Sequence, residues 1–256
     1  MAVDGTPIWA DITVSDIERS IDFYHRLLGW DFDPDAGPEM GGYRNARLGG
    51  GAVAGLSPAM PGQPDEAAAL SGRWCPYLAT SDVAATALVM GEGGAQLLLP
   101  PMPVGPFGHM AVLRDPQGAV VALWQAAAHA GFEVRDTHGA PCWVDLMTTD
   151  AQAAKEFYGA VFGYTYQAMD PDDDTYALVS APGVAEPVAG LMQWSSPSAW
   201  SIAFQVDDLA TSLTQAASLQ APVLSDIEDI GFGHTATIAG PDGEVFNLFQ
   251  PQPPLG

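Results

Sequence analysis

The sequence has 256 residues, of which 48% are hydrophobic and 15% are charged, so it is long enough to bury one large or two ordinary cores. Thirty-one acidic side chains against eight basic ones give a formal net charge of -23, which repels nucleic-acid phosphates and anionic membrane surfaces. We therefore expect neither a nucleic-acid nor a membrane partner. The first residues lack a signal-peptide pattern and no apolar run reaches the roughly 18 residues of a membrane span, which together predict a cytoplasmic protein. Two cysteines are too few for a disulfide framework.

An internal repeat dominates the sequence. The segment 5–16 recurs as 139–150, and both copies continue into a Phe-Tyr pair and a Gly-aromatic pair. The later segment 107–118 recurs in the same way as 232–243. Each copy spans nearly half of the chain, so duplication is the economical explanation. The predicted organisation is an N-terminal domain over 1–126, a linker over 127–138 and a C-terminal domain over 139–256.

The elements of the first half follow one another in a fixed order. Alternation over 8–14 predicts a strand, and apolar residues at helical spacing predict a helix from Ile17 until Gly29 ends it. A capping box from Ser15 to Glu18 marks the start of that helix, and the second half repeats it from Thr149 to Gln152. After this helix, the sequence predicts one further helix, over 82–90. The predicted strands are 43–48, 52–56, 74–80, 97–99, 110–113 and 119–124.

Four βαβββ modules account for the chain and predict an α+β fold with two tandem domains. With Asp16, Phe23-Tyr24 and Gly29-Trp30 after the first strand and Asp115-Pro-Gln-Gly118 before the last, the sequence resembles the vicinal oxygen chelate superfamily, and the resemblance implies that each domain is a curved, cup-like mixed sheet. This superfamily includes glyoxalases, extradiol dioxygenases and bleomycin-resistance proteins, and the resemblance extends to its two-domain actinobacterial members labelled glyoxalase-like or hydroxylase. Fold alone does not establish their activity.

The resemblance implies four defined strand positions at which metal-dependent members carry His or Glu. The residues at these positions in the two halves are Trp9, Gly55, Cys75 and Ala122, and Trp143, Gly190, Ser201 and Asn247. A divalent transition metal needs three or four converging His, Cys or carboxylate ligands, and one cysteine does not meet that requirement. We therefore expect no metal and no cofactor, and we reject the hypotheses that the chain is a metal-dependent glyoxalase or dioxygenase.

The vacated positions carry residues suited to an organic ligand. By the period of two in a strand, Trp9 shares a face with Asp11, and Trp143 shares a face with Asp145. By the strand spacing that the resemblance implies, the ligand-binding set is Trp9, Cys75, Tyr77 and Trp124 in the first half and Trp143, Ser201, Gln205, Asn247 and Phe249 in the second. Aromatic walls with few polar groups favour a flat aromatic or polyketide-like ligand, although the tryptophans fit a structural core role as well.

The candidate catalytic residues are the ionisable groups that recur in both halves, namely Asp11, Asp145, His109 and His234. A buried carboxyl or a histidine at a strand entry can move a proton near neutral pH. The alternatives are hydrogen bonding of the aspartates to nearby backbone or hydroxyl groups, and stabilisation of a turn by the histidines. Cys75 is a weaker candidate nucleophile because no base adjoins it in sequence, and the linker histidines His129 and His138 are expected to be solvated.

Two classes of function remain. The first is a metal-independent enzyme of the isomerase, cyclase or lyase type, acting by proton transfer on a small molecule of specialised metabolism. The second is a binding protein of the bleomycin-resistance type that captures a planar antibiotic without converting it. The expected partner is a small-molecule ligand or substrate, and the chain is expected to be a monomer or a homodimer.

Overall fold

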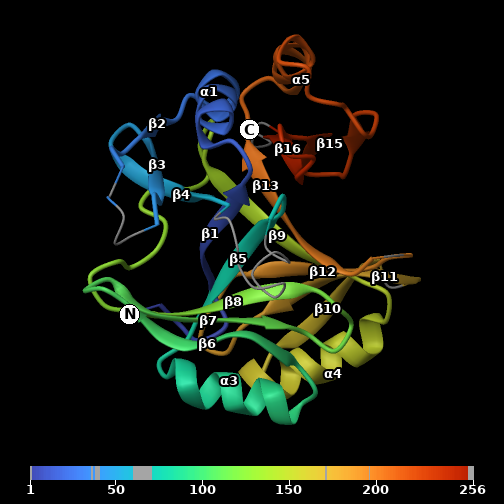
Figure 1. Cartoon of the computed structure of the whole chain (residues 1–256). Helices are drawn as coiled ribbons and strands as arrows, with labels where there is room; N and C mark the ends of the chain where they lie inside the picture. Colours follow the sequence, from blue (N-terminus) through green and yellow to red (C-terminus); the bar gives the residue numbers. More distant parts are fainter. Residues whose placement is uncertain are drawn as a thin grey trace.

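The structure is a computed structural model that describes residues 2–35, 37, 41–59, 71–170, 172–195 and 197–252. In these residues each half of the chain forms one curled, eight-stranded mixed sheet (Figure 1). In order across the first sheet, the strands are β2 (Asp31–Phe32), β3 (Arg44–Leu48), β4 (Gly51–Pro58), β1 (Pro7–Val14), β5 (Trp74–Ala79), β8 (Val120–Ala126), β7 (Gly108–Arg114) and β6 (Gln96–Val104). The strands of the second sheet, in the equivalent order, are β10 (Thr165–Asp170), β11 (Asp173–Ser180), β12 (Ala189–Gln193), β9 (Pro141–Thr148), β13 (Ala199–Gln205), β16 (Val245–Pro251), β15 (Gly233–Ala239) and β14 (Glu228–Asp229). The predicted α+β class and the tandem modules are thus confirmed.

The helices of the described part are α1 (Ile17–Leu28), α3 (Val83–Glu92), α4 (Ala151–Phe162) and α5 (Leu209–Ser218). An aspartate in extended conformation precedes each of them, and its carboxylate accepts a hydrogen bond from a backbone N–H of the first turn. The predicted capping boxes were wrong by one residue, because Asp16 and Asp150 are the N-caps while the Ser15 side chain donates to Asp242 at 2.7 Å. Gly29 ends α1 with φ of 74°, a left-handed conformation that glycine adopts without a steric penalty.

The two halves share one hydrophobic core between the helix-bearing faces of their sheets. Helix α1 packs beside α5 of the other half, and α3 packs beside α4 (Figure 1). Two equivalent hydrogen bonds cross the interface between the two halves, which we call the seam. They run from the Tyr24 hydroxyl to Glu244 at 2.7 Å and from the Tyr158 hydroxyl to Asp115 at 3.0 Å. Burial raises the pKa of both carboxyl groups, and each tyrosine supplies a donor that a buried carboxylate requires. The seam therefore relates the halves by an approximate two-fold arrangement.

Candidate functional site

The strand register gathers the predicted residues on the face of each sheet that is turned away from the helices. In the first sheet, β5 runs antiparallel to β1 and pairs Cys75 with Asp11 and Tyr77 with Trp9. Strand β8 runs parallel to β5 and brings Trp124 to the same face, opposite Ala79. We call the face formed by Trp9, Asp11, Cys75, Tyr77 and Trp124 the N-terminal cup.

The second sheet repeats this arrangement with different side chains. Strand β13 pairs Ser201 with Asp145 and Ala203 with Trp143. Strand β16 places Asn247 opposite Ala203, and Phe249 opposite Gln205. We call the face formed by Trp143, Asp145, Ser201, Gln205, Asn247 and Phe249 the C-terminal cup. Because β1 and β9 hold their aspartates at corresponding positions, each cup has one central carboxyl group.

In the N-terminal cup, two tyrosines surround the carboxyl group. The Tyr77 hydroxyl donates to Asp11 Oδ2 at 2.7 Å, and the Tyr43 hydroxyl also hydrogen-bonds Asp11 while accepting from Trp9 Nε1 at 2.9 Å. Burial raises the pKa of Asp11 from 3.8 to about 7, an effect that outweighs the opposing hydrogen bonds from Tyr77 and Tyr43. A carboxyl group that changes protonation near neutral pH is chemically suited to proton transfer.

In the C-terminal cup, Asp145 Oδ1 accepts hydrogen bonds from the Tyr176 hydroxyl at 2.8 Å and from Trp143 Nε1 at 3.0 Å. Burial raises the pKa of Asp145, and the hydrogen bonds from Tyr176 and Trp143 oppose this rise. The arrangement has a protonatable carboxyl group held by two fixed donors. Sequence reasoning missed Tyr176 and its counterpart Tyr43, because nothing in the hairpin sequences fixes which residues of these strands face the cup.

A glycine beside each aspartate makes room for the tyrosine. Gly55 pairs with Asp11 and Gly190 pairs with Asp145, on the neighbouring parallel strands β4 and β12. A Cβ atom at Gly55 would lie 1.7 Å from the Tyr43 hydroxyl, and one at Gly190 would lie 2.0 Å from Asp145 Oδ1. Any side chain at these positions would therefore displace the tyrosine from the aspartate.

The residues at the metal-ligand positions of the family do not fit a metal. Among the described residues, no three His, Cys, Asp or Glu side chains are placed to hold an ion together. The one carboxyl group of each cup is engaged by tyrosine and tryptophan donors, and the neighbouring ligand positions carry glycine, cysteine, serine, alanine or asparagine. This donor set does not match the three or four His, Cys or carboxylate ligands of a catalytic transition-metal site.

The linker covers the N-terminal cup. The His129 ring lies edge-on to Trp9 with 4.4 Å between ring centroids, and the Phe132 ring lies 5.5 Å from the same indole. The backbone N–H of Phe132 also donates to the carbonyl of Ile8 at 2.7 Å, which attaches the linker to β1. Trp9 is consequently only 3% exposed. The expectation that His129 is solvated was wrong, because packing on Trp9 half-buries its ring.

The C-terminal cup is more open and more polar. Its Trp143 and Phe249 side chains are partly exposed, whereas their counterparts Trp9 and Trp124 are buried, and Ala203 stands where the N-terminal cup has the bulky Tyr77. Thr237 Oγ1 donates to Asn247 Oδ1 at 2.8 Å, and Asn247 Nδ2 donates to Ser201 Oγ at 3.3 Å. This chain leaves the Ser201 hydroxyl proton available to a ligand. In the N-terminal cup, Ala122 replaces the asparagine, so no such relay forms there.

The two catalytic histidine candidates lie on the opposite face of their sheets. His109 pairs with Gln125 and His234 pairs with Gln250, while the neighbouring register positions Trp124 and Phe249 face the cups. The two glutamine side chains accept hydrogen bonds from the first residues of α3 and α5, which identifies their face as the helix-bearing one. The structure therefore does not bring His109 or His234 together with Asp11 or Asp145. A shift by one residue in a strand is enough to reverse the face on which a side chain lies.

A model of the Glyoxalase/Bleomycin resistance protein/Dioxygenase superfamily matches residues 7–123 and 140–248. The chain belongs to this superfamily. A putative glyoxylase, CFP32 of Mycobacterium tuberculosis, is 34% identical over 254 residues, which cover 97% of this chain and 96% of the relative. The anthracycline biosynthesis protein DnrV of Streptomyces peucetius is 30% identical over 263 residues, which cover 96% of this chain and 93% of the relative.

Solved structures of other superfamily members have the same fold. The 2,3-dioxygenase LapB from Pseudomonas sp. KL28 gives a TM-score of 0.64 at 15% identity and covers 100% of this chain and 97% of its own. The Mn(II)-bound glyoxalase from Novosphingobium aromaticivorans gives 0.66 at 14% identity and covers 98% of this chain and 83% of its own. At this identity the likeness shows the fold and not the activity.

Proposed function

We propose that the chain is a metal-independent enzyme of specialised metabolism that moves a proton within a small planar organic molecule, and that the reaction takes place in the C-terminal cup. The observation that carries the proposal is the pair formed by Asp145 and Ser201. They are register partners on adjacent antiparallel strands, so a carboxylate and an available hydroxyl lie side by side on the cup face. One group can remove a proton while the other stabilises the charge that develops.

The mechanism is an enolisation that needs no cofactor. The Asp145 carboxylate removes a proton from a carbon next to a ligand carbonyl, and the Ser201 hydroxyl donates a hydrogen bond to the carbonyl oxygen as negative charge develops on it. The chain from Thr237 through Asn247 orients Ser201 for this donation. In a ligand whose carbon–carbon double bond adjoins the deprotonated carbon, Asp145 returns the proton to the far carbon of that double bond, and the double bond moves next to the carbonyl, so the ligand is isomerised with no net loss of atoms or electrons. In a ligand without such a double bond, the proton returns to the same carbon and the only net change is exchange with solvent hydrogen.

The differences between the cups support the choice of the C-terminal one. A planar ligand needs an aromatic face to stack on, and His129 and Phe132 occupy the face that Trp9 offers. In the described residues no aromatic ring packs on Trp143. The Tyr77 ring fills space in the N-terminal cup that Ala203 leaves free in its counterpart.

The relatives named for anthracycline biosynthesis indicate the chemical class to test. An anthracycline has a planar, fused aromatic ring system with carbonyl and hydroxyl groups, which matches a stacking surface beside a carboxyl group and a hydroxyl donor. We therefore take fused-ring anthraquinones with an acidic C–H next to a carbonyl as the substrate panel.

The test is to incubate the protein with each panel compound in deuterium oxide and to follow the products by mass spectrometry. The proposal predicts deuterium uptake or a new isomer, and Asp145→Asn should slow either process by about 100- to 10,000-fold. His234→Ala, the matched control on the helix-bearing face of the same sheet, should react like the unmodified protein. No exchange and no product with any compound that binds the cup would refute catalysis.

The alternative is capture of a planar compound without turnover. The open face of Trp143 favours this function, because stacking alone requires neither Asp145 nor Ser201. Under capture, a bound panel compound is recovered unchanged and without deuterium, and Asp145→Asn alters its affinity by less than about threefold. The same deuterium experiment therefore separates the two functions.

A further inference from the structure

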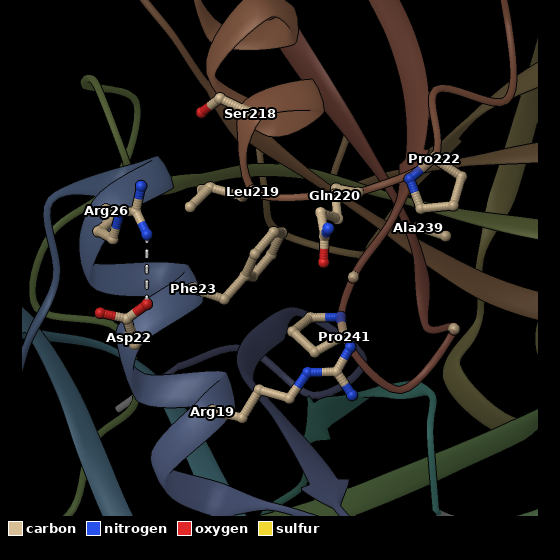
Figure 2. A pocket seen from close by; sticks show the side chains of 13 residues that line it. Arg19, Asp22, Phe23, Arg26, Ser218, Leu219, Gln220, Pro222, Ala239 and Pro241 are labelled. Carbon is tan, nitrogen blue, oxygen red and sulfur yellow. Dashed lines mark ion pairs between the residues drawn. The ribbon is translucent and has the colours of Figure 1, made fainter.

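Two clefts lie where helices of the two halves contact each other, one beside α1 and α5 and the other beside α3 and α4. The first, of about 500 Å³, lies between α1 and the chain that follows α5 (Figure 2). The second, of about 300 Å³, lies at the equivalent place between α4 and the end of α3. Phe23 and Phe157 take corresponding places in the two clefts, as do Pro241 and Pro116. The pair provides an internal comparison, because the two clefts have the same architecture and different side chains.

The first cleft has positive charge that the second lacks. Arg19 and Arg26 line it from α1, and the repeat aligns them with Ala153 and Ala160 in the second cleft. Asp22 pairs with Arg26 at 3.5 Å, whereas Arg19 pairs with no carboxylate among the described residues (Figure 2). In a chain with eight basic side chains and a net charge of -23, two arginines against the single carboxylate of Asp22 leave this cleft with a local positive charge that attracts an anion.

Gln220 adds an amide to the same cleft at a conformational cost. Its φ is 63°, one of two positive values for residues other than glycine in the described chain. The equivalent residue after α3 is Gly94, with φ of 98°, and both residues follow the same pattern of helix-terminating hydrogen bonds. Glycine adopts this conformation without strain, whereas a glutamine at this position goes against the local conformational preference. Its side chain points into the cleft between Phe23 and Pro241 (Figure 2).

We propose that the cleft between α1 and α5 binds a small organic anion, with a carboxylate or a similar planar oxyanion held by Arg19 and the Gln220 amide and its apolar part packed against the partly exposed Leu219 and Pro241. A guanidinium group provides paired N–H donors that match a planar oxyanion, and an amide provides a further N–H. Phe23 is 4% exposed and forms the floor of the cleft, and Leu219 and Pro241 flank it (Figure 2). The volume lies within the range of small-molecule sites. This site is distinct from the C-terminal cup and does not depend on the activity proposed for it.

The test is a titration of the ¹⁵N-labelled protein with 2-naphthoate, followed by the side-chain N–H signals of arginine and glutamine. The proposal predicts saturable shifts of the Arg19 and Gln220 signals, and it predicts affinity about tenfold lower for 2-naphthamide, the neutral analogue of the same shape. Arg19→Ala and Gln220→Gly introduce the residues found at the equivalent positions of the other half, Ala153 and Gly94, and should each weaken naphthoate binding by about tenfold. Both variants should fold, because their counterparts Ala153 and Gly94 occupy the same backbone conformations.

Asp145→Asn is the control that separates this site from the cup, and it should leave naphthoate binding and the Arg19 shifts unchanged. Equal affinity for the acid and the amide would overturn the proposal, as would normal binding by Gln220→Gly and Arg19→Ala. Shifts confined to residues of the C-terminal cup, or no shift at millimolar naphthoate, would overturn it as well.

Discussion

The raised pKa of Asp11 makes a quantitative prediction about stability. Burial favours the neutral carboxyl group, and a rise from 3.8 to about 7 corresponds to roughly 4 kcal/mol at 1.36 kcal/mol for each pH unit. The folded protein therefore keeps a proton that the unfolded chain releases between pH 3.8 and pH 7. The contribution of Asp11 to stability is fully present below pH 3.8, falls as the pH rises through this window and is constant above about pH 7.

Asp11→Asn removes the titrating group and keeps its shape, so the asparagine can still accept a hydrogen bond from Tyr77. The free energy of unfolding of the unmodified protein, minus that of the variant, should fall by roughly 4 kcal/mol between pH 4 and pH 8. Urea denaturation followed by circular dichroism at several pH values measures this difference. The other buried carboxyl groups, Asp115, Asp145 and Glu244, titrate in both proteins and cancel.

Asp226→Asn is the matched control, because it removes one negative charge from an exposed side chain outside the cup. Its difference curve should be flat within about 0.5 kcal/mol. For Asp11→Asn, a difference that rises with pH would show that the Tyr43 and Tyr77 hydrogen bonds outweigh desolvation and that the reasoning about the cup carboxyl is wrong. A flat curve would show that Asp11 is solvated.

Three further predictions follow from the site and the clefts. Trp143→Ala should weaken binding of an anthraquinone by about 1 to 3 kcal/mol in a fluorescence-quenching titration, whereas Trp9→Ala should lower the melting temperature and leave binding unchanged; equal weakening would contradict the choice of cup. Gln220→Gly should raise the free energy of unfolding by roughly 0.5 to 1 kcal/mol in urea, because it relieves a positive φ; a loss of stability would show that the glutamine is unstrained. Elemental analysis of the purified protein should find no stoichiometric Zn, Ni, Fe or Mn; one tightly bound equivalent, lost together with function on chelation, would refute the metal-independent mechanism.

The sequence was sufficient to predict the fold because its local signals agree with one another. The repeat, the strand alternation and the glycines that end α1 and α4 all indicate the same modules, and the structure has them. The error at the capping boxes was small, because Ser15 and Asp16 are both good N-cap residues and only the backbone conformation selects between them.

The candidate site was predicted only in part. Asp11 and Asp145 were placed correctly on the faces of Trp9 and Trp143, because alternation in β1 and β9 is regular. His109 and His234 follow glycines at strand entries, where the sequence does not fix which face the next side chain takes. Tyr43 immediately precedes β3, and its position depends on the register of the hairpin formed by β3 and β4 and on the space that Gly55 leaves in β4. Neither the register nor this space can be predicted from the sequence of one strand.

The sequence also could not predict that the linker covers Trp9. His129 lies in a polar, alanine-rich segment, and its position depends on the hydrogen bonds of the linker backbone to β1 and on the indole beneath it. A loop of this composition is ordinarily solvated, and the tertiary contact overrides that preference. The distinction between a covered and an open cup is therefore a property of packing and not of composition.

The two halves have diverged in complementary ways around a seam that remains symmetric. The buried pairs of Tyr24 with Glu244 and Tyr158 with Asp115 hold the halves together on both sides. Around this common core, the N-terminal cup is filled by Tyr77 and covered by the linker, so its buried surface contributes to stability, whereas the C-terminal cup keeps an open stacking surface and a polar relay. The clefts differ as well, but here the N-terminal half contributes the polar residues, because α1 has arginines where α4 has alanines. Duplication thus allows each half to support the shared core with one surface while its remaining surfaces diverge.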